Sequence, residues 1–386
     1  YLQFGIGSIF ARIFIASVFL TAFYSKRYFS IYQYLGDRFG HKTKYTAVVY
    51  FILTRLMASG VRLLMACIGV SVILGVPLEW CLLVFMLVAM VYTSMGGIKA
   101  VIWTDVVQGI VFISAGLITV CFIINHIGWS EIISLGKASG RFEFIHTKPT
   151  EPGMMAWLKD SNLWFLAILN GFIGTAAAFG TDQDITQRVL TCKDVASAKK
   201  SMILSGFISI PIAGLFLFIG VSLFAYYQIN TDPNLPVQPE AIFPYFIQNE
   251  LPPGLKGIAV IGVFAAAMSS LDSAMAALSS SAINDLLKKV VSKSSDRSPL
   301  FVSRITILVF GSILALLALL LEDQKELFWL SFKMVSITYG AMLGIFVLGL
   351  MTKRGSDTGN LVYLGCLLGA LGLFRVIRVI RVIRVI

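Results

Sequence analysis

The sequence predicts an all-α polytopic membrane protein, on three observations. Hydrophobic residues make up 57% of the chain and charged residues only 13%, whereas soluble domains are about a quarter charged. Apolar stretches of about 20 residues, long enough for a helix to cross a bilayer, recur along the chain. These stretches lack the alternating polarity of short β-barrel strands. The chain is therefore expected to form a helical bundle with lipid as its solvent.

The predicted membrane spans are bounded in several places by Gly and Pro, as in LGVPLEW and NELPPGLKG. Four strong spans precede the polar loop around residue 140, and five strong spans follow it. A weaker tenth span begins near residue 360. The nine stronger spans cover residues 5–24, 46–75, 79–98, 100–124, 162–182, 201–227, 255–284, 300–321 and 326–351.

The loops between these spans differ in their positive charge. Alternate loops hold most of the Lys and Arg residues, and the opposite loops hold fewer. Because cytoplasmic loops of membrane proteins are enriched in Lys and Arg, the first set is predicted to lie in the cytoplasm. The span over 5–24 is then expected to run inward. The first set consists of Lys26, Arg27, Arg38, Lys42, Lys44, Arg188, Lys193, Lys199, Lys200, Lys288, Lys289, Lys293, Arg297, Lys353 and Arg354.

A polar face lies inside the span over 255–284, in the stretch AAAMSSLDSAMAALSSS. Ala266, Ser269, Ser270 and Ser273 are spaced so that they share one side of a helix. Asp272 adds a charge, which costs a few kcal/mol in the middle of a membrane helix unless it is compensated. This face predicts either an oxygen-rich hollow or a close contact between two helices.

Four motifs together resemble the sodium:solute symporter family: FSIYQYLGDRFG, YTSMGGIKAVIWTDVVQG, GTDQDITQRVLTCKD and AAAMSSLDS. Their order and spacing extend the resemblance over about residues 1–365. It implies a five-plus-five inverted repeat (LeuT-like) and alternating access, with inward sodium movement coupled to uptake of a small organic solute across the plasma membrane. The span over 5–24 matches the family's second core helix. The chain is therefore expected to be truncated, without the first core helix and the end of the last one.

The resemblance also implies cation ligands. The principal sodium site maps to the backbone carbonyl of Ala266 and the hydroxyls of Ser269 and Ser270. A second sodium site maps to Asp105, Asp272 and Ser273, with Asp272 standing where several relatives carry Ser or Thr. That extra carboxylate could strengthen a cation site, or carry a proton in its place. The alternative for Asp105 is a helix-start acid that suits the helix dipole.

Substrate contacts are predicted from intramembrane polar residues. Arg55 and Arg62 share a helix face at i and i+7, and the sialic acid carrier in this family binds a carboxylate near the Arg55 position. These candidates point to an anionic solute, while structural pairing remains the alternative for both arginines. Arg12 is expected to pack against an acid or against helix-end carbonyls. The candidate substrate residues are Arg55, Arg62, Thr175 and Lys333.

Other functions are less well supported by the sequence. It contains no HExxH, G-x-S-x-G or Walker motif, so an enzyme is not expected, and its positive charge is divided among loops rather than gathered as for nucleic acid. No cofactor besides the sodium ion is expected. The alternatives are a symporter-like sensor module and an ion channel without coupled solute. One transporter domain is predicted over 1–370, and the repeated RVI tail at 371–386 is interpreted as an artefact.

Overall fold

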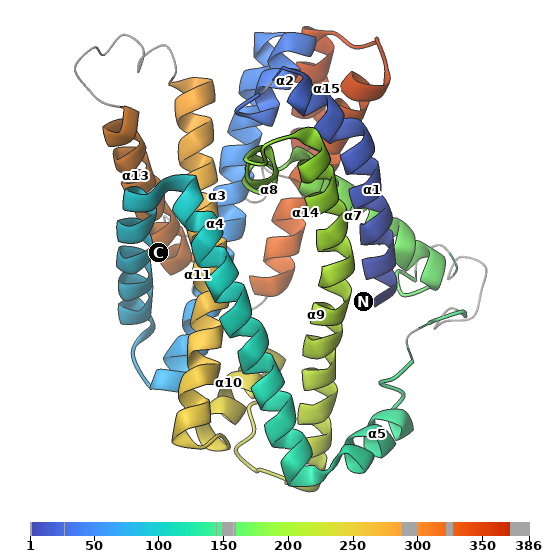
Figure 1. Ribbon diagram of the computed structural model, residues 1–386, viewed down its shortest axis with the longest axis vertical. Coiled ribbons are helices and arrows are strands. Elements are labelled where there is room, and N and C mark those ends of the chain that lie inside the picture. The colour runs from blue at the N-terminus through green and yellow to red at the C-terminus, as the bar shows by residue number, and fades with distance from the viewer. Residues whose placement is uncertain are drawn as a thin grey trace.

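Long helices run side by side along most of the length of the molecule and form a bundle (Figure 1). The structure is a computed structural model, and it describes residues 2–26, 28–143, 145–148, 157, 160–287, 299–321 and 327–370. The RVI tail at 371–386 lies outside the described residues, as do the basic loop residues at 288–298. The side chain of Lys333 also lies outside them.

Seven of the described helices are long and apolar enough to cross a membrane, namely α1, α3, α4, α7, α9, α11 and α13. The chain is thus a multi-pass membrane protein, as predicted. The helices are α1 (Leu2–Ser25), α2 (Ile31–Arg38), α3 (His41–Leu74), α4 (Leu78–Ile127), α5 (Trp129–Ala138), α7 (Trp164–Thr181), α8 (Gln183–Leu190), α9 (Val195–Ile229), α10 (Pro239–Asn249), α11 (Pro253–Ser281) with the π-helical turn η1 (Ala282–Leu286), α13 (Pro299–Leu320), α14 (Leu327–Met351) and α15 (Asp357–Ala370).

Helix α4 contains two of the predicted spans, 79–98 and 100–124. Its two limbs meet at Gly97, whose backbone has φ 58° and ψ −166°. Only glycine adopts this region readily, because it has no Cβ. Figure 1 shows the limbs joined by a sharp turn near the end of the molecule that carries α2 and α15. Asp105 therefore lies about two turns into the second limb.

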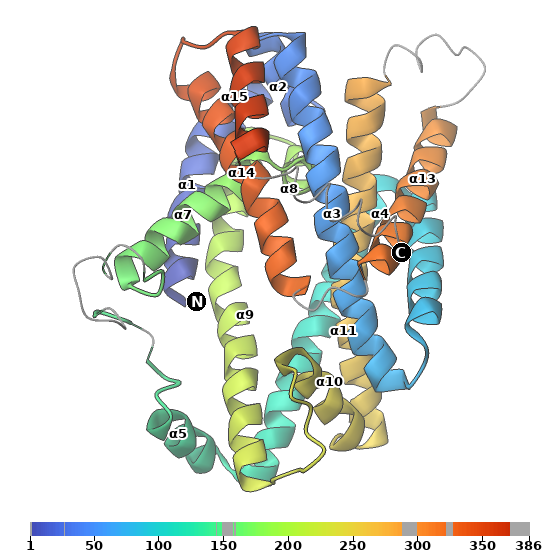
Figure 2. The ribbon, with the colours of Figure 1, turned by 180° about the vertical axis from the view of Figure 1, so that it is seen from behind.

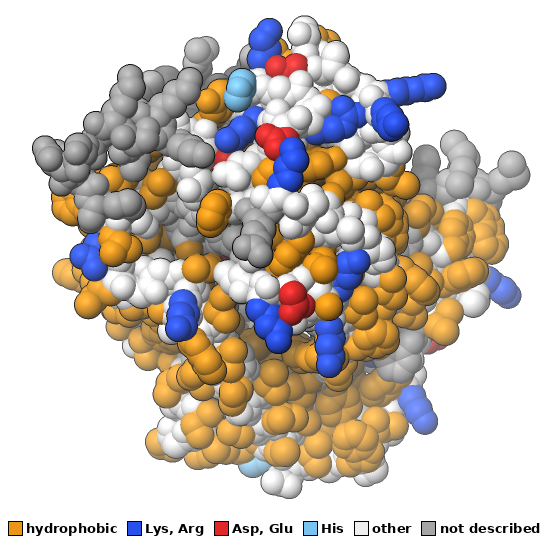
Figure 3. Space-filling model, turned by 45° about the horizontal axis from the view of Figure 1, so that its top comes forward, with side chains coloured by type: hydrophobic (Ala, Val, Ile, Leu, Met, Phe, Trp, Pro, Cys, Tyr) orange, Lys and Arg blue, Asp and Glu red, His pale blue; other side chains and the backbone are white. Residues whose placement is uncertain are grey.

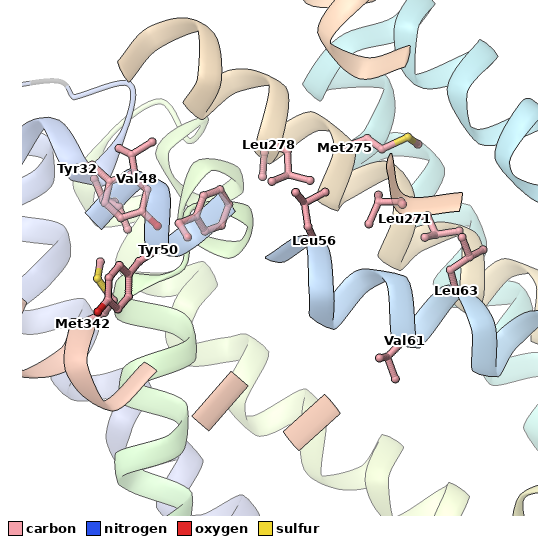
Figure 4. Packing of buried hydrophobic residues seen from close by; sticks show 14 of the residues in the cluster. Tyr32, Val48, Tyr50, Leu56, Val61, Leu63, Leu271, Met275, Leu278 and Met342 are labelled. Atoms are coloured by element: carbon pink, nitrogen blue, oxygen red, sulfur yellow. The ribbon is translucent and has the colours of Figure 1, made fainter. Parts of the chain in front are cut away.

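Two groups of helices pack against each other. Helix α1 packs on α7 and α9, while α11 packs on α3 and α4. Helix α14 contacts both α3 and α7 and so joins the groups (Figure 2). Between α3 and α11 the core is apolar, where Leu56 and Leu63 face Leu271, Met275 and Leu278 (Figure 4). This packing holds the polar face of α11 at a fixed position against α4.

Glycine residues allow the backbones of α1 and α7 to come into direct contact. A Cβ placed on Gly7 would lie 2.0 Å from the carbonyl oxygen of Ile168, and one on Gly171 would lie 2.1 Å from that of Phe4. Small residues at such contacts let membrane helices pack closely. The α1–α7 contact therefore depends on these two glycines.

We expect Gly171→Ala to destabilise the protein by about 1–3 kcal/mol, because the added methyl group forces the two backbones apart. The measurement is the melting temperature of the purified protein in detergent. Gly174→Ala is the matched control, since its Cβ would lie 3.7 Å from the nearest atom, in ordinary contact. Equal melting temperatures for the two variants would contradict the close contact.

The surface agrees with a membrane environment. Several Lys and Arg side chains surround the end that carries α2 and α15, whereas the sides below it are mainly hydrophobic (Figure 3). Large apolar side chains such as Trp80, Trp103 and Ile110 are more than half exposed on the long helices. In lipid, such exposure carries no penalty of the kind that water imposes.

Candidate functional site

The polar face of α11 meets Asp105 of α4. The Ser269 hydroxyl donates a hydrogen bond to one carboxylate oxygen of Asp105 at 2.5 Å. One turn further along α11, the Ser273 hydroxyl donates to the backbone carbonyl of Ser269 at 2.8 Å. Ala266 and Ser270 lie half-buried on the same helix. The structure thus brings Asp105 to the serine face, across 164 residues of sequence.

Asp272 lies inside the protein and is fully buried. One of its carboxylate oxygens accepts a hydrogen bond from the Tyr92 hydroxyl at 2.7 Å. The other accepts from the backbone N–H and the hydroxyl of Ser273, at 2.6 Å and 3.2 Å. Among the residues that the structure describes, no Lys, Arg or His forms an ion pair with it. Asp272 is therefore a buried carboxylate with neutral partners only.

Arg188 provides a counter-ion for Asp105. Its guanidinium lies 2.8 Å from the second carboxylate oxygen of Asp105 and 3.7 Å from a carboxylate oxygen of Asp184. The sequence placed Arg188 among the basic residues of the predicted cytoplasmic loops. The structure adds its partner, because the short helix α8 carries Arg188 beside the second limb of α4. Asp105 thus has Arg188 as its counter-ion, whereas Asp272 has none among the described residues.

Arg55 is held between two carboxylates at the start of α8. Its guanidinium forms ion pairs with Asp182, at 3.3 Å, and with Asp184. Asp182 also accepts a hydrogen bond from the Tyr339 hydroxyl at 2.5 Å and caps α8 through the Asp184 N–H. With Arg55 and both aspartates buried, the structure favours the structural pairing that the sequence left open for this arginine.

Gln183 joins α8 to the segment before α2. Its side-chain oxygen accepts a hydrogen bond from the Ile31 N–H at 3.0 Å, and its nitrogen donates to the Phe29 carbonyl at 3.1 Å. The side chain is fully buried. Gln183 therefore fixes α8, and with it Arg188, relative to the α1–α2 connection.

A cavity of about 190 Å³ lies between α1, α7 and α9. Its polar groups are the hydroxyls of Ser8, Thr175 and Ser209 and the guanidinium of Arg12, and the remaining lining is apolar. Thr175 is the candidate substrate residue that the sequence placed on the span over 162–182. The other three polar residues were not among the predicted substrate contacts.

Arg12 does not pack against an acid or helix-end carbonyls as expected. Its side chain is only 7% exposed, and one terminal nitrogen donates to the Ser205 hydroxyl at 2.8 Å. Its carbon Cζ lies 4.2 Å from the centre of the Phe179 ring, a cation–π contact. Its Nε is buried without a hydrogen-bond partner, and no described residue forms an ion pair with it. The expectation failed because the neighbouring turn of α9 presents a serine instead.

The remaining substrate candidates are not brought together with Thr175. Arg62 is half-buried on α3, two turns from Arg55, and does not line this cavity. Lys333 belongs to α14, but its side chain lies outside the described residues. The predicted set of four residues thus does not form one pocket in the described part of the chain.

The atoms around Ser269 that could bind a cation are oxygen atoms of hydroxyls, carboxylates and backbone carbonyls. Such ligands suit a hard cation of low charge better than a transition metal, which favours nitrogen and sulfur. The group of Asp105, Ser269, Ser273 and Asp272 therefore offers the oxygen ligands that a hard cation prefers.

Residues 1–369 match the sequence pattern that defines the sodium:solute symporter family. The sodium/sialic acid symporter SiaT of Proteus mirabilis is 30% identical over 337 residues, or 85% of this chain and 66% of that protein. The sodium/glucose cotransporter of Vibrio parahaemolyticus is 28% identical over 374 residues, covering 91% and 67% of the two chains. The human sodium-coupled monocarboxylate transporter 1 is 26% identical over 355 residues, covering 90% and 57%.

The fold is similar to a solved structure of a Na⁺-coupled sialic acid symporter in a substrate-bound outward-open state. The TM-score is 0.78 and the sequence identity 25%, and the match covers 92% of this chain and 74% of that one. The chain spans about two-thirds or less of the length of the curated relatives that it matches.

Proposed function

Because the chain belongs to the sodium:solute symporter family, we propose that it is the membrane core of a transporter that couples inward sodium movement to uptake of a small organic solute. The family and the relatives named above are transporters, not enzymes. Sialic acid, glucose and monocarboxylates are the solutes in the relatives' names. The coupling ion is sodium, and no other cofactor takes part.

The observation that carries this proposal is the buried carboxyl group of Asp272 on the helix that carries Ser269, without a counter-ion among the described residues. Asp105 has Arg188 as its partner, whereas Asp272 has none among the described residues. An unpaired buried carboxylate is costly, because its charge has lost most of its hydration. A sodium ion bound between α4 and α11 would supply the missing positive charge.

The proposed ligands divide into two sites, as the sequence predicted. Ala266, through its carbonyl, and the hydroxyls of Ser269 and Ser270 bind the principal sodium ion. Asp105, Asp272 and Ser273 bind the second one. Ser269 contributes to both, since its hydroxyl already contacts Asp105.

The transport cycle follows alternating access in a single domain over residues 1–370, built as a five-plus-five inverted repeat. The repeat is supported by the likeness to the sialic acid symporter. The cavity between α1, α7 and α9 and the cation ligands on α11 then lie in the two helix groups that α14 joins. We place the transporter in the plasma membrane, with the end that carries α2 and α15 in the cytoplasm.

We expect Ser269→Ala and Ser270→Ala each to lower sodium affinity roughly 5- to 30-fold, because each removes one neutral oxygen ligand worth about 1–2 kcal/mol. The measurement is the sodium concentration that gives half-maximal uptake into proteoliposomes. Ser280→Ala, on the same helix but beyond the polar face, is the matched control. If these serines serve only in helix packing, both changes will leave sodium dependence unaltered.

Coupling is tested by replacing the external cation. We expect solute uptake to follow an imposed sodium gradient and to fail with potassium or choline. If uptake persists without sodium but follows a pH gradient, the coupling ion is the proton and not sodium. Current that flows without any solute would instead support the channel alternative.

A further inference from the structure

Arg12 is a permanent charge that lies near the middle of a membrane helix. Arginine stays protonated in proteins, so its charge cannot be removed by burial. A cation at the centre of a membrane helix costs a few kcal/mol on insertion scales, and such residues mark binding or ion pathways when they face the protein interior. Arg12 does face the interior, because it lines the cavity between α1, α7 and α9.

The protein stabilises this charge with neutral groups only. The Ser205 hydroxyl accepts one hydrogen bond and the Phe179 ring lies beside the guanidinium. Nε makes no hydrogen bond, although it is buried. No carboxylate of the described residues is within ion-pair distance. The cavity thus contains a cation that lacks a counter-ion and retains donor capacity.

The position of Arg12 is also fixed by packing. A Cβ on Gly206 of α9 would lie 3.1 Å from Cδ of Arg12, so the side chain runs tightly across this glycine. Together with the Ser205 bond, this contact orients the guanidinium before any ligand arrives. Such preorganisation favours binding, because less side-chain freedom is lost.

We propose that this cavity binds the transported solute and that the solute is a small organic anion, with its carboxylate paired to Arg12. This inference rests on the proposed transport function. A guanidinium donates N–H hydrogen bonds to a carboxylate, and the terminal nitrogen of Arg12 that does not bond Ser205 is the donor for it. The hydroxyls of Ser8, Thr175 and Ser209 contact the polar remainder of the solute.

A neutral solute fits the cavity less well. Its hydroxyls could accept from Arg12, but the buried charge would still lack a counter-ion. The volume of about 190 Å³ is below the roughly 300–1,000 Å³ of pockets for drug-sized ligands, so the anion is small. Arg12 thereby replaces Arg55 as the residue that recognises the anion, since Arg55 is already paired with Asp182 and Asp184.

The test compares anions with uncharged partners of nearly the same shape. The melting temperature of the purified protein is measured in sodium-containing detergent buffer with each solute in turn. Lactate is compared with its neutral partner lactamide, and gluconate with its neutral partner glucose. We expect at least one carboxylate to raise the melting temperature while its neutral partner does not. Arg12→Gln should weaken the apparent affinity for that anion about 10- to 100-fold, and Arg12→Lys should restore part of it. Arg304→Gln, which removes an exposed arginine of α13, should leave it unchanged.

A second variant keeps the test decisive if Arg12→Gln fails to fold. Ser209→Asp places a carboxylate in the cavity, where it should pair with Arg12. We expect this variant to melt higher than the parent without ligand and to lose the response to the anion. Retention of that response in Ser209→Asp would overturn the pairing of solute and Arg12.

Two outcomes separate this inference from the proposed function. If sodium still stabilises the protein but a neutral solute does so as well as its carboxylate partner, the anion assignment is overturned and sodium coupling stands. The same holds if sodium stabilises the protein but neither carboxylate does. A protein that neither sodium nor any of the four solutes stabilises would contradict the proposed function itself.

Discussion

Arg55→Gln should lower the free energy of unfolding by about 3–5 kcal/mol, the usual effect of breaking a buried ion pair by removing one partner. The change leaves Asp182 and Asp184 without the Arg55 counter-ion, and their side chains are only 2% and 6% exposed. Their lost hydration is no longer compensated by the guanidinium. The measurement is the loss of stability of the purified protein in detergent, by melting temperature or denaturant.

The double variant Arg55→Gln/Asp184→Asn sharpens this test. If the two residues stabilise each other, the double change will destabilise the protein by less than the two single changes added together. Arg62→Gln is the matched control, because Arg62 lies on the same helix without an ion pair to a described residue. A nearly neutral Arg55→Gln would return this residue to the set of candidate solute contacts.

The helices could be predicted because membrane spans have a local signal. Their length and apolarity are set by the bilayer, so the predicted ends agree with the observed ones to within a few residues for spans such as 5–24 and 162–182. The break in α4 was also predicted at nearly the right place. The break lies within the pair Gly96 and Gly97, and Gly97 supplies the positive φ that the turn requires.

The cation group was predicted only in part. Spacing along one helix could place Ser269 and Ser273 on one side of α11, and the resemblance to the family added Asp105. No local pattern could join Asp105 to Arg188 or Arg55 to Asp184, because these partners lie far apart in the sequence. One signal was present in TDQDITQR, where two acids follow an apolar span.

The solute cavity was missed for a related reason. Ser8, Arg12 and Ser209 look like isolated polar residues in apolar helices, and only the packing of α1 against α7 and α9 brings them together. Arg12 was expected to pack against an acid or against helix-end carbonyls. The structure shows a serine and a phenylalanine instead.

Asp105→Asn and Arg188→Gln should shift sodium affinity in opposite directions. A carboxylate about 4 Å from a cation contributes up to about 4 kcal/mol at a protein-like dielectric constant, so Asp105→Asn should weaken sodium binding by up to about 1,000-fold. Arg188 is a tethered cation that already neutralises Asp105 at 2.8 Å. Arg188→Gln removes this competitor, and we expect it to strengthen sodium binding several-fold. Sodium titrations of uptake and of melting temperature measure both effects.

The control for these titrations is Asp37→Asn, which removes an exposed carboxylate of α2 that pairs with Lys26 and not with the cation group. Its sodium affinity should equal that of the parent. If Arg188 only supports the fold, Arg188→Gln will instead lower both stability and sodium affinity, because it leaves Asp105 without a partner. A rise in sodium affinity with little loss of stability requires that sodium replaces the guanidinium at Asp105. Sodium release would then be assisted by the return of Arg188, which pairs again with Asp105 when the site empties.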